Sequence, residues 1–197
     1  MRSSVRLAIA TLFVAASSAA AQAPGAAAAP AGPVGPVGPA APAAGEMAPD
    51  FTAPWADASG TRSAPVSLKS LRGKVVVLAF YPLDRSGGCT IELSKFRDDY
   101  ATLFGENVVV LPVSVDSLES HTSWAKDAKF PFSMISDTKG ELATKYGSTR
   151  PGAKYFSRTI FVIGKDGRIS YEQLKFNVQS QDAWDQLAQE IKKAKTS

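Results

Sequence analysis

Hydrophobic residues occur along this chain in short runs that predict alternating strands and helices from about residue 46 onward. The run VVVLAF at residues 75–80 has no polar position and is rich in β-branched residues, which is typical of a strand buried on both faces. Residues 108–115 form a second run of this kind. Between the two runs, residues 89–104 carry apolar side chains at helical spacing, which predicts an amphipathic helix.

The second half of the chain continues the alternation and closes with a hairpin and a helix. The predicted elements are helices at residues 117–128, 141–146 and 183–194 and strands at residues 159–163 and 169–172. Asp116 or Ser117 is the expected N-cap of the first of these helices, and Gly147 ends the second. The Asp166-Gly167 pair between the two strands is a strong hairpin signal.

The order of these elements, β-α-β-α-α-β-β-α, predicts an α/β domain. Two βα units place parallel strands side by side, and the hairpin adds antiparallel strands to the same sheet. The last helix is amphipathic, with Trp184, Leu187 and Ile191 on its inward face. We therefore expect a thioredoxin-like fold, in which helices flank a central mixed β-sheet.

The first 45 residues differ in composition from the rest of the chain. Residues 1–21 have Arg2 and Arg6 before an apolar run of about ten residues, as in a secretory signal peptide. An uncleaved membrane anchor is the alternative interpretation. Residues 22–45 are almost entirely Ala, Pro and Gly and predict a disordered linker, which leaves residues 46–197 as the folded domain. No cysteine follows the apolar run, so we predict an exported, periplasmic protein without a lipid anchor.

The charge of the chain argues against nucleic acid and membranes as partners. The formal net charge is +4, with 22 Lys and Arg against 18 Asp and Glu. Removing the signal peptide takes away two arginines, so the balance falls to 20 against 18, or +2. This small excess favours neither a nucleic-acid nor an anionic-membrane partner. We expect a monomer or a homodimer.

Cysteine content is the most informative feature of the composition. Cys89 is the only cysteine and His121 the only histidine, so no internal disulfide can form. A CxxC redox pair and a cysteine or histidine metal site are excluded, and no metal or cofactor is predicted. A single thiol in an exported protein is either buried and inert or retained for its reactivity. For His121 we predict a structural or surface role.

Cys89 lies at the start of the predicted helix that follows the first buried strand. Helix N-termini offer unpaired N–H groups and a partial positive charge, and both stabilise the thiolate that acts as nucleophile. Gly87 and Gly88 allow the preceding loop to turn tightly. The alternative is a packing role, because Cys89 shares a helix face with Leu93 and Phe96.

The residues before Cys89 resemble a known family. Pro82, Ser86 and Cys89 reproduce the P-x-x-x-[T/S]-x-x-C motif of the peroxiredoxins. Phe80-Tyr81-Pro82 and Gly88-Cys89-Thr90, followed by Glu92, are similar to the bacterioferritin-comigratory type of that family. Further similar segments follow in the family's order at residues 113–117, 130–132, 136–137, 145–147 and 157–163. The resemblance covers roughly residues 46–194.

The resemblance implies a thiol peroxidase and assigns roles to four residues. Cys89 attacks the peroxide, Arg158 and Ser86 donate hydrogen bonds, and Pro82 shields the sulfur from water. Each helper has a plainer alternative: Ser86 as a helix cap, Arg158 as a surface residue, and Pro82 as the end of a strand. Glu92 either orients Arg158 or is only a favourable acid in the first helical turn.

The sequence departs from the family in two places. Gly87 stands where many relatives have proline, which makes the loop less rigid. A second, resolving cysteine is absent, so the sulfenic acid formed at Cys89 must be reduced by an external thiol, pair with Cys89 of another molecule, or oxidise further. We expect the first outcome, with a small thiol or an exported thioredoxin-like protein as the reductant. The expected substrates are hydrogen peroxide and, as a second class, organic hydroperoxides. The competing functions are a non-catalytic thioredoxin-fold binding module and an exported thiol-disulfide protein, although the latter requires a second nearby cysteine.

Overall fold

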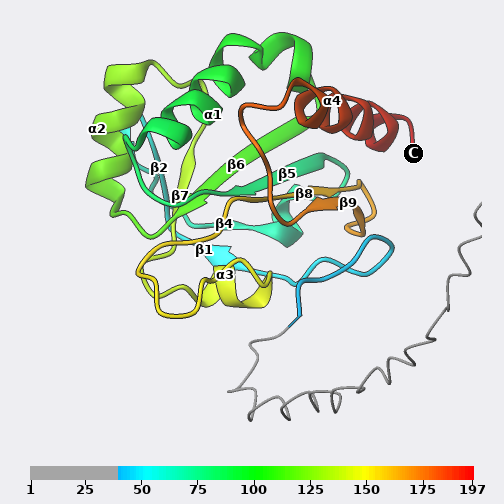
Figure 1. The fold of residues 1–197 in the computed structure, drawn as a ribbon, viewed down its shortest axis with the longest axis horizontal. Helices are drawn as coiled ribbons and strands as arrows, with labels where there is room; N and C mark the ends of the chain where they lie inside the picture. The colour runs from blue at the N-terminus through cyan, green and yellow to red at the C-terminus, as the bar shows by residue number, and fades with distance from the viewer. Residues whose placement is uncertain (1–39) are drawn as a thin grey trace, which may run out of the picture. The chain divides into compact units, whose positions relative to one another are not determined.

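The computed structural model describes residues 40–197, which form one layered α/β domain around a seven-stranded sheet (Figure 1). The strands are β1 (Thr52–Ala53), β2 (Trp55–Asp57), β3 (Gly60–Thr61), β4 (Val66–Ser67), β5 (Val75–Phe80), β6 (Val108–Ser114), β7 (Met134–Ser136), β8 (Thr159–Ile163) and β9 (Ile169–Gln173). The helices are α1 (Gly87–Asp98), α2 (Leu118–Ala128), α3 (Glu141–Lys145) and α4 (Gln181–Thr196), with a 3-10 turn η1 (Leu68–Leu71) and a π-helical turn η2 (Tyr100–Phe104).

The central sheet is mixed, as predicted. Its strand order is β3-β2-β7-β6-β5-β8-β9, with β5, β6 and β7 parallel to one another. β8 pairs antiparallel with β5, and β9 pairs antiparallel with β8. The separate pair β1–β4 lies outside this sheet. β5 is therefore central, and the loop that follows it opens at the carboxyl edge of the parallel strands.

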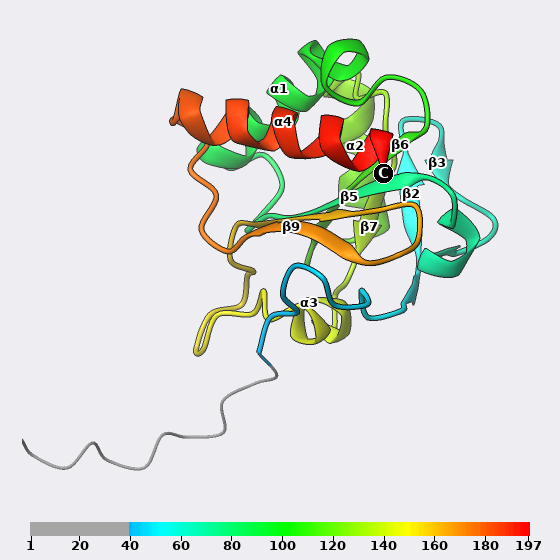
Figure 2. The ribbon, with the colours of Figure 1, turned by 90° about the vertical axis from the view of Figure 1, so that its right-hand side faces the viewer.

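Two hydrophobic clusters, one on each face of the sheet, explain why the run at residues 75–80 is uniformly apolar. Val75, Val77 and Ala79 face the cluster that contains residues of α1, α2 and α4. Val76, Leu78 and Phe80 face the cluster that contains residues of α3 and the N-terminal strands. Because successive strand residues point to opposite faces, every position of β5 is buried. Figure 2 shows α1 and α4 on one side of the sheet and α3 on the other.

Most predicted elements are present, and the differences lie in short ones. β8 spans Thr159–Ile163 as predicted, and α2 begins after the N-cap Ser117, whose side chain accepts a hydrogen bond from the Ser120 N–H. β7 was not predicted, because a strand of three residues is too short to show a period. The predicted helix 89–104 begins two residues earlier, at Gly87, and changes to a π-helical turn at Tyr100.

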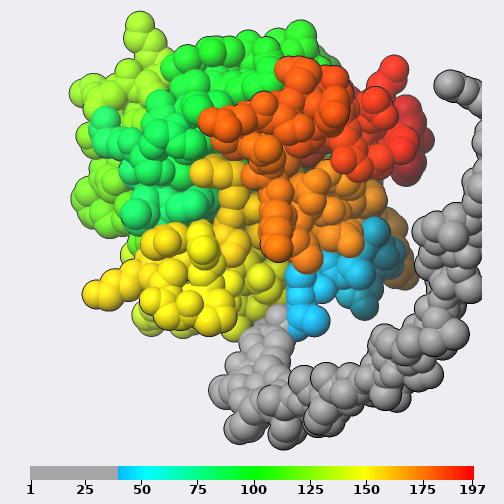
Figure 3. Space-filling model, viewed as in Figure 1, coloured from blue at the N-terminus to red at the C-terminus, as the bar shows by residue number. Residues whose placement is uncertain are grey.

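The described part of the chain begins inside the predicted linker, and its first residues lie against the domain. The Gly45 N–H donates to the Ile169 carbonyl at 2.8 Å, and Pro42 is buried. Figure 3 shows this segment in blue beside the orange β8–β9 hairpin. The predicted signal peptide and most of the linker lie outside the described residues. Among residues 40–197, no helix is long and apolar enough to cross a membrane.

Candidate active site

Cys89 occupies the first turn of α1, beyond the carboxyl end of β5. Ser86 is the N-cap residue, so Cys89 is the third residue of the helix. Its N–H and those of Gly87 and Gly88 belong to the helix start, where the backbone N–H groups have no partner within the helix. Cys89 is 0% exposed, and its sulfur lies in the cluster shared by α1, α2 and α4. A helix start therefore directs its positive end at a buried thiol.

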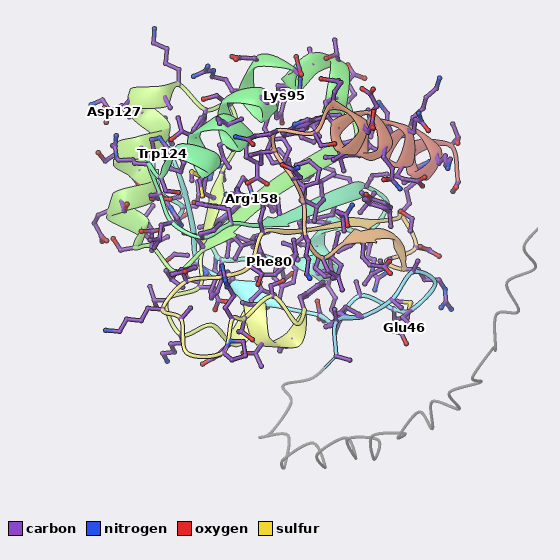
Figure 4. All side chains as sticks on the ribbon, in the orientation of Figure 1. Glu46, Phe80, Lys95, Trp124, Asp127 and Arg158 are labelled. Carbon is purple, nitrogen blue, oxygen red and sulfur yellow. The ribbon has the colours of Figure 1, made fainter. Side chains whose placement is uncertain are left out.

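Arg158 reaches this sulfur from the residue just before β8, the strand that pairs with β5. β5 pairs with β8 so that Phe80 is opposite Thr159, which places the residue before β8 next to the end of β5. From there the Arg158 Nη2 donates to Cys89 Sγ at 3.4 Å, although the two residues are 69 positions apart. In the view of Figure 4, Arg158 is labelled between Lys95 of α1 and Phe80 of β5. The alternative of a surface arginine does not describe this side chain, which is only 16% exposed.

Gly88 makes this approach of the arginine possible. A Cβ atom at Gly88 would lie 3.0 Å from Arg158 Nη2, closer than such atoms normally come. The glycine therefore leaves room for the guanidinium directly beside the first turn of α1. A cation and the helix N-terminus thus converge on one sulfur, and both favour its thiolate form.

Glu92 holds the opposite side of the same guanidinium. Its Oε2 accepts from Arg158 Nη1, and its carboxyl group is completely buried. Burial raises the pKa of Glu92 to about 7, although the Arg158 charge and hydrogen bond pull it down. The pKa of Arg158 is raised: burial favours its neutral form, but the Glu92 charge and the contact with Cys89 outweigh that cost. Glu92 thus orients the Arg158 side chain, so its role is more than that of a favourable acid in the first turn of the helix.

Ser86 and Pro82 lie in the loop before α1 but are not joined to Cys89 by a described hydrogen bond. The Ser86 Oγ donates to the Leu83 carbonyl at 3.1 Å. Ser86 is the N-cap by position, yet its side chain makes no capping hydrogen bond. Its hydroxyl is therefore not committed to stabilising the helix. Pro82 is half-buried directly after Tyr81.

Sequence reasoning missed a polar cluster beneath this loop. Asp84 lies between Pro82 and Ser86, and its carboxylate contacts Tyr81 Oη at 2.6 Å and His121 Nδ1 at 3.0 Å. His121 is 0% exposed, so of its two predicted roles the structural one applies. The only available signal was that Asp84 lies within the motif, because nothing in the sequence shows which distant residue it meets.

The arrangement supports nucleophilic chemistry on a small molecule. Within residues 40–197, no group of three or more His, Cys, Asp or Glu residues is placed to hold a metal ion. Two surface pockets flank α3, and neither includes Cys89. Because the sulfur is completely buried, a substrate of few atoms reaches it more easily than a large one. The cation and the unpaired N–H groups beside it can stabilise an oxygen that gains negative charge.

Replacing Gly87 with proline is expected to stabilise the domain by about 0.5–1 kcal/mol, because proline restricts the unfolded chain. Gly87 is the first helical residue, where proline is favoured, and a Cβ there would meet nothing within 4 Å. Ser86 already has φ −71° and ψ 152°, which suits a residue before proline. Urea unfolding of both proteins measures the change. A lower midpoint in the variant would show that this turn needs the freedom of glycine.

Known sequences are similar to most of this chain. Residues 44–172 match the AhpC/TSA family. The bcp protein of Coxiella burnetii, whose name includes peroxiredoxin, is 39% identical over 132 residues, which cover 64% of this chain and 84% of that protein. Peroxiredoxin Bcp of Bacillus subtilis is 32% identical over 140 residues, which cover 68% of this chain and 86% of that protein.

Solved structures have the same fold. Peroxidoxin BcpB from Mycobacterium tuberculosis superposes with a TM-score of 0.65 at 27% identity, covering 76% of this chain and 96% of that one. AhpC from Enterococcus faecalis has a TM-score of 0.68 at 25% identity, covering 78% of this chain and 92% of that one. Their similarity extends over the whole described domain rather than over the motif alone.

Proposed function

Because this chain belongs to the AhpC/TSA family and is a peroxiredoxin of the Bcp type, we propose that Cys89 is its peroxide-reducing residue. The protein is a thiol-dependent peroxidase with a thioredoxin-like fold. The contact between Arg158 Nη2 and Cys89 Sγ at 3.4 Å is the observation that carries the assignment of the site. A non-catalytic binding module would have no need of a buried cation at its only thiol.

The Cys89 thiolate attacks one oxygen of the peroxide, so that an S–O bond forms and the O–O bond breaks. The sulfur is oxidised to sulfenic acid, and the departing oxygen leaves as hydroxide, or as alkoxide from an organic hydroperoxide, and takes up a proton. Arg158 and the N–H groups at the start of α1 stabilise the charge on that oxygen. Ser86 donates to the peroxide once its hydroxyl turns away from Leu83, and Pro82 limits access of water to the sulfur.

An external thiol completes the cycle, because the chain has a single cysteine. A first thiol condenses with the sulfenic acid, which releases water and forms a mixed disulfide. A second thiol then displaces Cys89 as a thiolate. In sum, two thiols are oxidised to one disulfide. Hydrogen peroxide gives two molecules of water, and an organic hydroperoxide gives one alcohol and one water. We assign this role to a small thiol or to an exported thioredoxin-like protein.

The N-terminal sequence supports a proposal about location. The positively charged start, the apolar run and the Ala-x-Ala site favour export to the periplasm by a cleaved signal peptide. Neither nucleic acid nor, after cleavage, a membrane is among the proposed partners. The oligomeric states consistent with the proposal are monomer and homodimer, which sedimentation of the purified protein distinguishes.

Rapid mixing of the reduced protein with one equivalent of hydrogen peroxide tests the function. Trp124 and Trp184 lie in the same core cluster as Cys89, so tryptophan fluorescence is expected to report its oxidation. Dimedone then labels the sulfenic acid, and the intact mass of the protein gives the number of adducts. We expect oxidation orders of magnitude faster than that of free cysteine, with one adduct at Cys89. A rate no greater than that of free cysteine would show that Cys89 is only a packing residue.

A further inference from the structure

The loop that joins β5 to α1 is held in place by a buried cluster of polar side chains. We call residues 81–86 the active-site loop. Within it, the Asp84 carboxylate accepts from Tyr81 Oη at one oxygen, at 2.6 Å. Its other oxygen accepts from Ser120 Oγ at 2.6 Å and contacts His121 Nδ1 at 3.0 Å. Asp84 is therefore an acceptor for groups of the loop and of α2 at once.

The surroundings of His121 determine where its protons lie. Its Nε2 contacts the Ile135 carbonyl at 3.2 Å, and a carbonyl oxygen can only accept a hydrogen bond. Nε2 therefore carries a proton. Nδ1 faces Asp84 Oδ2, which also accepts from Ser120 Oγ. The ring therefore bridges Asp84 of the loop and the Ile135 carbonyl of β7.

Arg85, the next residue of the loop, also binds α2, at the surface of the domain. Arg85 Nη2 donates to Asp127 Oδ2 at 2.6 Å and to Ser123 Oγ at 3.0 Å, both on α2. The backbone of Arg85 has φ +59°, a left-handed conformation that is unfavourable for arginine. Such strain persists only where surrounding contacts impose it, and it is often found at functional sites. Figure 4 shows Trp124 and Asp127 on the helix that receives these contacts.

A third attachment ties the loop to the end of β6. The Asp84 N–H donates to Asp116 Oδ2 at 2.8 Å, and the same oxygen accepts from Ser114 Oγ at 2.7 Å. The side chain of Asp84 thus binds α2, while its backbone binds the residues after β6. Because Ser86 and the start of α1 follow within three residues, these contacts set the position of the groups that meet the peroxide.

We propose that His121 is a positioning residue for the peroxidase reaction, and that its ring, held between Asp84 and the Ile135 carbonyl, keeps the active-site loop against α2. The inference rests on the proposed function of Cys89. It adds a pair of residues that touches neither sulfur nor substrate. Its effect is to keep Ser86, Pro82 and the N–H groups of α1 directed at the place where the O–O bond breaks.

The single histidine allows a direct test of this geometry. Tag-free protein labelled with ¹⁵N-histidine gives the ring nitrogens of His121 alone, without further assignment. We expect Nε2 to carry a proton, because it faces the Ile135 carbonyl, which can only accept. An Nε2 without a proton would overturn the hydrogen bonds on which the proposal rests.

The positioning role is tested with His121→Gln and Asp84→Asn. For each protein, the rate of Cys89 with hydrogen peroxide is divided by its rate with iodoacetamide. A displaced loop slows the reaction with hydrogen peroxide, which uses Ser86 and the aligned N–H groups, but not the reaction with iodoacetamide. The ratio of the two rates is therefore expected to fall at least tenfold. A change of less than twofold in both variants would overturn the positioning role.

Leu68→Ala is the matched control, because Leu68 is a buried residue of η1 on the opposite face of the sheet. It destabilises the domain without contacting the loop, and its ratio is expected to equal that of the wild type. If it lowered the ratio as much as His121→Gln, general loss of stability would explain the effect and the inference would fail. A wild-type peroxide rate no faster than free cysteine would instead refute the proposed function itself.

Discussion

Replacing Cys89 with serine is expected to reduce peroxide turnover by at least about 10³-fold, to the level of the buffer. A serine hydroxyl stays protonated at neutral pH and is a poor nucleophile toward an O–O bond, whereas a thiolate is a good one. No second cysteine can take over the reaction. Consumption of hydrogen peroxide in the presence of a reducing thiol measures the change.

The serine variant is expected to remain folded, so that loss of activity reports chemistry alone. Serine is slightly smaller than cysteine, and its hydroxyl can accept the hydrogen bond that Arg158 now donates to sulfur. Circular dichroism and urea unfolding of both proteins provide the control. Retained turnover in a folded Cys89→Ser protein would refute the mechanism, and dimedone labelling of that variant should give no adduct.

Replacing Arg158 with alanine is expected to slow oxidation of Cys89 by about 10²–10³-fold, the usual cost of losing one donor to a developing oxyanion. The variant loses the donor that lies 3.4 Å from the sulfur and faces the place where the departing oxygen gains charge. Stopped-flow fluorescence of the reduced protein with hydrogen peroxide measures the rate. Equal oxidation rates for the two proteins would remove Arg158 from the site.

The same variant has a second consequence, at Glu92. Without Arg158, the buried carboxyl loses the only partner that lowers its pKa, so this pKa should rise further above about 7. A folded pKa above the unfolded value of 4.5 means that stability is greatest below pH 4.5 and declines as the pH rises through the folded pKa. Arg158→Ala should therefore lose more stability than the wild type between pH 5 and 8, and urea unfolding at both pH values tests this.

Arg158→Lys is the matched comparison for charge. Lysine keeps the positive charge but lacks the planar fork that reaches Glu92 and Cys89 together. We expect oxidation rates between those of the wild type and Arg158→Ala. A rate as low as that of the alanine variant would show that geometry, rather than charge, provides the effect.

The position of Cys89 could be predicted from the sequence, because it depends on local pattern. A uniformly apolar run at residues 75–80 indicated a central strand, and a glycine pair followed by helical spacing indicated a helix start. Arg158 required the resemblance to a family, since the register that pairs Phe80 with Thr159 is set by contacts far apart in the chain. No periodicity of residues 157–163 alone could have provided that register.

The polar cluster beneath the loop could not be predicted for a related reason. The contact between Asp84 and His121 joins residues 37 positions apart, and its partners follow no repeating spacing. A buried histidine and a surface histidine look alike in a single sequence. Only the placement of the Ile135 carbonyl and of Asp84 on opposite sides of the ring distinguishes them.

The complete burial of Cys89 also determines which oxidants can reach it. Hydrogen peroxide needs only a small local opening to reach the sulfur, whereas a protein disulfide needs a far larger one. A lone thiol can thus persist in an oxidising environment without being captured as an adventitious mixed disulfide. The reducing thiol meets the same barrier, so Cys89 must become exposed before it is regenerated, and at high concentrations of reductant this exposure limits the rate of turnover.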